Sequence, residues 1–256
     1  FPYTTLPIQQ MESREDLVFI AQLNENAERY DDMIETMKKI IALGEELNDK
    51  ERNLLSVAYK NIIGPRRAAW RIVSTIETRE KGRSKPNQSR IDYVTAYRLK
   101  IEDELKGYCN DVLSLIDKEF IPKATEVTAK VFYSKMQGDY YRYLAEFTQK
   151  EDRKGYAGQS LGAYKQATQI AEQLQPTDPI RLGLALNFSV FYYEIMNDSE
   201  KACELARTAF DAAINDLDKL SQEAYKDATL IMQLLRDNLN LWVNEDHVEG
   251  ADDEQQ

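Results

Sequence analysis

The sequence predicts an all-α protein of nine antiparallel helices, and three observations carry this prediction. Apolar residues recur at spacings of three and four along nearly the whole chain, from Leu17 and Ala21 near its start to Leu235, Leu239 and Trp242 near its end. No segment shows the alternation of β-branched residues that is typical of a strand. Seven prolines and ten glycines in 256 residues leave long uninterrupted stretches, so we expect long helices joined by short links.

Local signals place the helix ends within this pattern. Asn48 and Ser199 are predicted N-caps, because such side chains accept a hydrogen bond from the first turn. Pro179 suits the first position of a helix, which needs no N–H donor. Pro65 lies inside the third helix, which we expect to bend but to continue, since its apolar stripe extends on both sides. The predicted helices are residues 13–27, 30–44, 49–79, 88–117, 123–148, 151–174, 178–196, 199–216 and 221–244.

Two short segments flank one predicted helical domain, residues 13–244. Residues 1–12 contain two prolines and no basic region of a signal peptide, so we expect a flexible leader, either a native extension or a cloning remnant. Residues 245–256 contain six of the 44 acidic residues, and this run predicts a disordered tail.

Composition excludes several classes of protein and site. The formal net charge of -11 argues against nucleic acid or an anionic membrane as the main partner. The sequence contains no run of eighteen apolar residues, so we do not expect a helix that inserts into a membrane. The single histidine, His247, lies in the acidic tail, which argues against a zinc site or a Ser-His-Asp mechanism in the helical body. Cys109 and Cys203 lie far apart in predicted helices, which favours a reducing, cytoplasmic location. We therefore expect no enzymatic activity and no cofactor.

Basic residues share a helix face at two places in this acidic chain. Lys135 and Arg142 are seven residues apart, hence within roughly 20° of one another around a helix, and Tyr143 follows the arginine. A second set, spaced by seven and four, comprises Lys60, Arg67 and Arg71. Each set alone is equally typical of a solvated helix surface. We hypothesise that the two faces converge on a phosphate.

Two later helices place amides among apolar residues at helical spacing. Asn187 lies seven residues before Glu194, and Asn238 lies four residues after Leu234. The apolar positions beside them are Leu186, Val190, Leu230 and Leu234. Core packing is the ordinary role of such leucines and valines. Together with the amides, which offer both a donor and an acceptor to an extended backbone, they predict a peptide-binding groove.

Several long segments resemble the 14-3-3 family, in order and across nearly the whole chain. These are ERYDDM at 28–33, LLSVAYKN at 54–61, GDYYRYLAE at 138–146, PIRLGLALNFSVFYYE at 179–194 and LIMQLLRDN at 230–238. The resemblance extends from about Ser13 to Trp242. It implies a cup-shaped protomer that forms a dimer and whose concave groove binds a phosphoserine or phosphothreonine peptide.

The resemblance also implies a role for individual residues. The implied phosphate-binding residues are Lys60, Arg67, Arg142 and Tyr143, supported by the basic residues Arg71 and Lys135. The implied contacts to the peptide backbone are Asn187, Asn238 and Glu194, and the implied apolar wall comprises Leu186, Val190, Leu230, Ile231 and Leu234. The chemistry agrees, because guanidinium forks, an ammonium and a phenol all suit a phosphate dianion.

By the same resemblance the first four helices form a dimer interface. Its implied apolar positions are Leu23, Ala27, Ala69, Ile72, Ile76 and Tyr97, and its implied intersubunit ion pairs are Arg29 with Glu104 and Asp32 with Lys100. Two positions depart from the family pattern. Ala69 and Asp246 stand where many members carry a phosphorylatable residue, so these two controls are not expected here.

We therefore predict an adaptor that clamps, masks or bridges phosphorylated client proteins. It would act as a homodimer, or as a heterodimer with other isoforms, in the cytoplasm and in the nucleus through its clients. One alternative is a tetratricopeptide-like scaffold that binds unmodified acidic peptides through the same cations. A more remote one is an enzyme that uses the scattered carboxylates, for which no histidine, metal motif or phosphate loop is found in the body.

Overall fold

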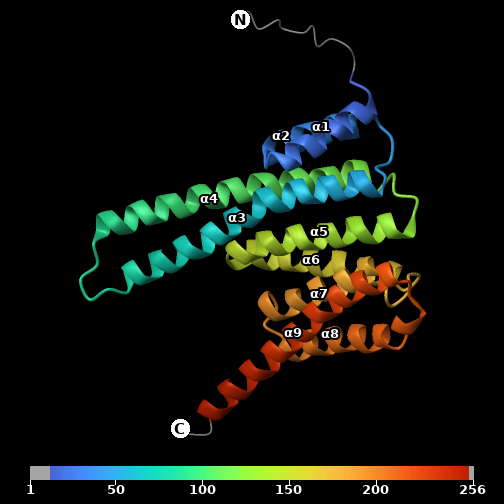
Figure 1. The fold of residues 1–256 in the computed structure, drawn as a ribbon. Helices are drawn as coiled ribbons and strands as arrows, with labels where there is room; N and C mark the ends of the chain where they lie inside the picture. The colour runs from blue at the N-terminus through green and yellow to red at the C-terminus, as the bar shows by residue number, and fades with distance from the viewer. Residues whose placement is uncertain (1–11, 254–256) are drawn as a thin grey trace, which may run out of the picture. The chain divides into compact units, whose positions relative to one another are not determined.

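The computed structural model describes residues 12–253, with side chains described for residues 12–244. Within this part of the chain there are nine α-helices, two short η elements and no strand (Figure 1), so the all-α prediction is confirmed. The chain forms two compact units that meet in sequence at Val112 and Leu113, inside α4. The cup shape and the dimer stay predictions.

The first unit contains three complete helices and most of a fourth. They are α1 (Arg14–Asn26), α2 (Tyr30–Ala42), α3 (Asp49–Lys81) and α4 (Gln88–Leu115). The Asn48 side chain accepts a hydrogen bond from the Glu51 N–H, and the Glu51 carboxylate returns one from the Asn48 N–H, so the predicted N-cap is confirmed as a capping box. The third helix is unbroken at Pro65, as expected.

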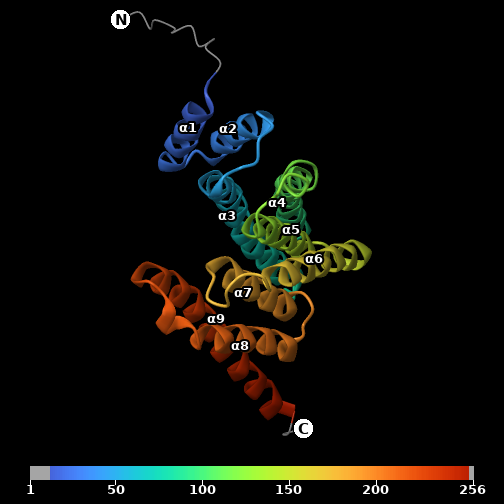
Figure 2. The same cartoon turned by 90° about the vertical axis from the view of Figure 1, so that its right-hand side faces the viewer.

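Polar contacts join α3 and α4, which lie side by side as a long antiparallel pair (Figures 1 and 2). The Tyr59 hydroxyl donates to Asp111 over 2.5 Å, and the Trp70 indole donates to Glu102 over 2.8 Å. Glu77 accepts from Arg98, from Lys81 at 2.7 Å and from Thr95 at 2.7 Å. The apolar core of the unit includes Met33, Met37 and Ile40 of α2, Leu55 and Ile63 of α3, and Leu105 and Cys109 of α4.

The second unit contains five further helices and two short η elements. They are η1 (Ile116–Phe120), α5 (Val127–Phe147), α6 (Lys150–Ala171), α7 (Pro179–Glu194), α8 (Ser199–Ile214), η2 (Leu217–Lys219) and α9 (Gln222–Asp253). One cluster of buried residues centres on Tyr164, Phe188 and Phe191, and a second on Leu182, Met232 and Trp242. Residues of α7 belong to both clusters, so this helix connects the packing of α5 and α6 to that of α8 and α9.

Gly138 sets the close approach of α5 to α6. A Cβ atom built on it would lie 2.8 Å from two ring carbons of Tyr164, a distance that real Cβ atoms do not show. The backbone of α5 therefore touches the aromatic ring directly, and the Ser160 hydroxyl also donates to the Gly138 carbonyl over 2.8 Å. This approach brings the Tyr164 hydroxyl to the polar residues of α5.

The helix boundaries differ from expectation at three places. Ser199 is the first helical residue rather than the N-cap, because the Asp198 carboxylate, one residue earlier, accepts from the Lys201 N–H. The fifth helix starts at Val127 rather than 123, after the η1 turn and Pro122. The ninth continues to Asp253 rather than ending at 244, since no proline stops it.

The segments that flank the predicted domain are only partly covered by the structure. The predicted acidic tail begins inside α9, and the side chains of residues 245–256 lie outside the described part of the chain. Residues 1–11 of the predicted leader also lie outside it. Pro179 does occupy the start of α7, where the Asp178 carboxylate accepts from the Ile180 N–H, so this predicted helix start is confirmed.

Candidate functional site

Asp139 is the centre of a polar cluster built from three helices of the second unit. Its Oδ2 atom accepts from the Lys135 ammonium over 2.8 Å, one helical turn earlier on α5. Its Oδ1 atom accepts from the Tyr164 hydroxyl of α6 over 2.5 Å and from the Asn187 amide of α7 over 2.8 Å. A single buried carboxylate therefore orients an ammonium, a phenol and an amide. We call Lys135, Asp139, Arg142, Tyr164 and Asn187 the Asp139 cluster.

The charge of this cluster is set by burial and by its cations. Burial alone would raise the pKa of Asp139, but the charges of Lys135 and Arg142 outweigh it and hold this pKa below its usual value. Burial beside Asp139 raises the pKa of the Tyr164 hydroxyl well above its usual value. At neutral pH the carboxylate is therefore ionised and the phenol is a neutral donor. Two cations and one anion leave the cluster with a formal charge of +1.

Arg142 is buried but only loosely neutralised. Its Nε donates to the Tyr164 hydroxyl over 3.2 Å, and its guanidinium carbon lies 4.9 Å from the centre of the Tyr143 ring. Its terminal nitrogens lie 3.6 Å from Asp139 and 3.7 Å from Glu194, which is longer than a hydrogen bond. The guanidinium is thus held through Nε, while its two terminal nitrogens have N–H donors that a closer anion could accept hydrogen bonds from.

The predicted apolar wall lies on α7 and α9 of the same unit. Leu230 and Leu234 are 68% and 47% exposed, although leucines at helical spacing usually face a core. Leu186, Val190 and Ile231 are half-buried and pack against the cluster that contains Leu182 and Trp242. The two amides differ in placement, since Asn187 donates to Asp139 while Asn238 is half-buried on α9. The second unit therefore carries exposed leucines on α9 in addition to a cationic cluster built from α5, α6 and α7.

The other predicted cations belong to the first unit, along α3. Lys60 and Arg71 are exposed and Arg67 is half-buried. Their spacing of seven and four residues in an unbroken helix places them on one face, as expected. The structure thus describes the α5 and α3 sets each within its own unit, and their joint action on one phosphate stays a prediction.

Comparison with known proteins gives one consistent family. The chain matches the family model of the 14-3-3 protein over residues 20–243. It is 68% identical over 233 residues to a 14-3-3 protein of Giardia intestinalis, covering 91% of this chain and 94% of the relative. It is 59% identical over 241 residues to the 14-3-3-like protein GF14 iota of Arabidopsis thaliana, covering 94% and 89% of the two chains. The chain belongs to the 14-3-3 family.

A further relative has a name that describes a role. This 14-3-3 chain is 58% identical over 240 residues to the checkpoint signal transducer rad24 of Schizosaccharomyces pombe, covering 93% of this chain and 88% of the relative. All the predicted site residues, from Leu23 to Asn238, lie within the residues that the family model matches. The tetratricopeptide-like alternative is therefore wrong about the family.

The predicted dimer residues of this 14-3-3 chain form an exposed apolar set on the first unit. Leu23, Ile72 and Tyr97 are 55%, 61% and 57% exposed, Ala27 is exposed, and Ala69 and Ile76 are half-buried. Three of the four residues predicted to pair between subunits have partners within the protomer instead. Arg29 pairs with Asp32, and Glu104 with Arg66 at 2.9 Å. The intersubunit pairs stay predictions, and forming them would require these contacts to exchange.

Tyr164 is the residue of the cluster that the sequence did not indicate. It contacts Asp139 and Arg142 from a different helix, so no spacing along α5 could reveal it. One available signal was Gly138, an isolated glycine in a helix, which commonly marks the close approach of another element. Among the described residues there is no group of three or more metal-ligating side chains, and no described helix is long and apolar enough to span a membrane.

Proposed function

We propose that this 14-3-3 protein is a non-enzymatic adaptor that binds phosphoserine- or phosphothreonine-containing segments of client proteins. The observation that carries the proposal is the state of Arg142, whose buried guanidinium is fixed through Nε while its two terminal nitrogens lie beyond hydrogen-bond distance of any carboxylate among the described residues. A phosphate dianion supplies what these donors lack, because it accepts several charge-assisted hydrogen bonds at once.

The remaining phosphate contacts follow from the resemblance and from charge. The phosphate would be contacted directly by Arg142, by the Tyr143 hydroxyl, and by Lys60 and Arg67 of α3. Lys135 and Arg71 would act as supporting charges. Lys135 suits a supporting role, because its ammonium already donates to Asp139. A cluster charge of +1 is too small to balance a dianion, which is why the proposal needs the α3 cations as well.

The Asp139 cluster also orients the amide that would hold the peptide backbone. A carboxylate only accepts hydrogen bonds, so the Asn187 nitrogen must face Asp139 and its carbonyl oxygen must face the opposite way. That oxygen would accept a backbone N–H of the client, with Asn238 and Glu194 as further contacts. Leu230 and Leu234 would pack against the apolar side of the peptide, because they are exposed in the free protein.

We further infer a homodimer, with a heterodimer as an alternative, that joins two such grooves. The exposed apolar side chains of Leu23, Ile72 and Tyr97 support an interface on the first unit, because isolated large apolar groups gain from burial. Two grooves in one particle would bridge two sites in a client, or two clients, at a raised effective concentration. The expected location is the cytoplasm, with entry into the nucleus through clients.

Replacing Arg142 by alanine tests the proposal. Hydrogen bonds to charged groups are worth about 1.5–3 kcal/mol each, so losing them should weaken phosphopeptide binding by about a hundredfold. Fluorescence anisotropy with a labelled phosphopeptide measures the affinity, and circular dichroism checks that the helices persist. Lys154→Ala on α6 is the matched control, because Lys154 is exposed and outside the cluster. An Arg142→Ala protein that binds as tightly as the Lys154→Ala protein would refute the assigned role.

A further inference from the structure

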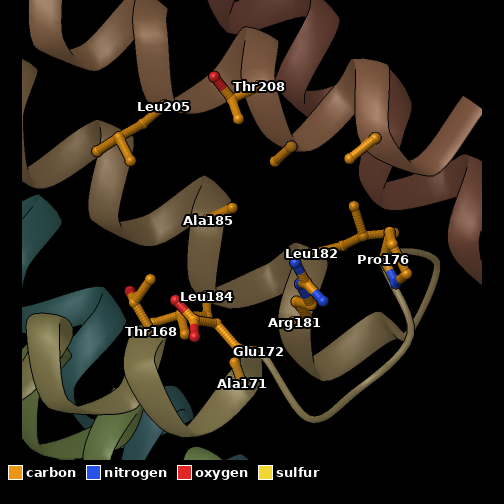
Figure 3. A pocket seen from close by; sticks show the side chains of 12 residues that line it. Thr168, Ala171, Glu172, Pro176, Arg181, Leu182, Leu184, Ala185, Leu205 and Thr208 are labelled. Carbon is orange, nitrogen blue, oxygen red and sulfur yellow. The ribbon is translucent and has the colours of Figure 1, made fainter.

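A hollow lies between α6, α7 and α8, and its mostly apolar lining includes four alanines. Ala171, Ala185, Ala209 and Ala212 line it from these three helices, and we call it the alanine hollow. Figure 3 shows this hollow from close by. Its volume is about 180 Å³. An engineered apolar cavity of about 150 Å³ stays dry and binds benzene, so the alanine hollow has room for a six-membered ring with a short attachment.

The wall of the hollow carries one half-buried cation. Arg181 of α7 lines it, and its Nη1 donates to the Leu174 carbonyl over 2.6 Å. This is the one hydrogen bond that Arg181 makes within the described part of the chain, so Nε and Nη2 have no protein acceptor there. The contact fixes one end of the guanidinium beside an apolar lining. The remaining donors suit a carboxylate, whose geometry matches a guanidinium.

The carboxylate of Glu172 also lines the hollow, and its negative charge opposes the attraction of Arg181 for an anion. Figure 3 shows Glu172 on the same side as Arg181, with Leu205 and Thr208 across from them. Glu172, the C-cap residue of α6, is exposed, and no ion pair joins it to Arg181 among the described residues. Water and salt therefore screen its charge, while the half-buried Arg181 has the stronger effect on a bound anion.

We propose that the alanine hollow binds small carboxylates that carry an apolar body of about the size of benzene, with the carboxylate on Arg181. An apolar lining excludes ligands that would bury an unpaired polar group, and the arginine selects the anion over a neutral analogue. The site does not depend on the proposed phosphopeptide groove, since none of its lining residues belongs to the Asp139 cluster. The two sites share α7, which carries both Ala185 and Asn187.

Titration of the isotope-labelled protein with 3-phenylpropionate, followed by NMR chemical shifts, tests this proposal. For a ligand of this size we expect saturable shifts with a dissociation constant on the order of 1 mM. The matched neutral probe is 3-phenylpropanamide, which we expect to bind about tenfold more weakly because it cannot pair with Arg181. Equal binding of the two probes, or no saturable shift up to about 20 mM, would overturn the proposal.

Five variants test whether the binding belongs to the hollow. Arg181→Gln should weaken 3-phenylpropionate about tenfold, and Glu172→Gln should strengthen it about twofold by removing a like charge. Ala185→Leu should abolish binding by filling the hollow, and Ala209→Leu serves the same purpose if the first variant does not fold. Arg142→Ala should leave the affinity unchanged. Binding that is lost with Arg142→Ala and kept with Arg181→Gln would show that the probe occupies the phosphate cluster, which contradicts the proposal.

Discussion

The Tyr164 hydroxyl serves two partners at once, as a donor to Asp139 over 2.5 Å and as an acceptor from Arg142 over 3.2 Å. Tyr164→Phe keeps the ring that packs between Gly138 and Phe188 and removes both hydrogen bonds. We expect it to cost about 1–2 kcal/mol of folding free energy, as for other buried hydrogen bonds. Because the Arg142 guanidinium loses its anchor, phosphopeptide affinity should also fall about tenfold.

The control for Tyr164→Phe is Tyr156→Phe, also on α6. Tyr156 stacks on Tyr141, with ring centres 6.4 Å apart, and is outside the Asp139 cluster. Urea unfolding and fluorescence anisotropy measure the two effects. A Tyr164→Phe protein that loses stability but binds phosphopeptide as tightly as the Tyr156→Phe protein would show that the hydroxyl is structural and does not position Arg142.

The sequence revealed those members of the cluster that share a helix. Lys135 and Arg142 could be paired from their spacing alone, because a helix places residues seven apart on one face. The loose neutralisation of Arg142 could not be predicted from spacing, since it depends on which acceptors the other helices supply. Asp139 lies on the same helix as these two cations, yet it also holds Tyr164 from α6 and Asn187 from α7. Contacts between helices need the packing as well as the pattern.

At the scale of elements, Glu77 stabilises the α3–α4 pair and does so in a pH-dependent way. Hydrogen bonding to Arg98 outweighs burial and lowers the pKa of Glu77 to about 2, with Lys81 and Thr95 assisting. The folded state therefore binds a proton here less readily than the unfolded chain. The stabilisation is present above the unfolded pKa of about 4.5 and is lost as the pH falls towards 2.

Glu77→Gln should remove this stabilisation at neutral pH. We expect a loss of about 2 kcal/mol in the free energy of unfolding at pH 7, and a smaller difference from the wild type at pH 3. Urea titrations at the two pH values measure it. Glu119→Gln is the control, because Glu119 forms only a part-exposed pair with Lys123, one turn away on the surface. An equal loss for Glu77→Gln at both pH values would contradict the role of ionisation.

The helices themselves were predictable because their signals are local. The capping box at Asn48 and the proline at 179 each act within one turn, and both helix starts are confirmed. The error at Ser199 has the same origin, since Asp198 and Ser199 are adjacent capping residues and the sequence does not decide between them. The predicted end of the ninth helix, residue 244, was wrong. An acidic composition favours disorder, but the residues between 244 and Gly250 include no helix-stopping residue.

At the scale of the whole molecule, the exposed apolar residues of the first unit are expected to make a dimer. Ile72→Glu places a charge in that set and should shift the protein towards a monomer of 29.6 kDa. Light scattering at micromolar concentration measures the mass. Leu230→Glu is the matched control, since it charges an equally exposed apolar residue of the second unit. A wild-type mass near 29.6 kDa would contradict the dimer outright.

The acidic end of the chain should compete with a negatively charged client. Residues 245–256 contain six acidic residues, so their deletion should strengthen phosphopeptide binding about twofold to threefold at low salt. Added salt should remove the difference, because screening weakens interactions between exposed charges. Anisotropy titrations of the protein with residues 245–256 and of the truncated protein without them, at two salt concentrations, measure the effect. Unchanged or weaker binding of the truncated protein at low salt would count against this competition.

The requirement for the phosphate dianion is the central claim, and one comparison tests it most directly. The wild-type protein is titrated with the same labelled peptide in phosphorylated and unphosphorylated form, by fluorescence anisotropy. We expect binding of the phosphorylated form alone, weakening as the pH falls below the second phosphate pKa of about 6. Equal affinity for the two forms would contradict the proposed function, whatever the variants show.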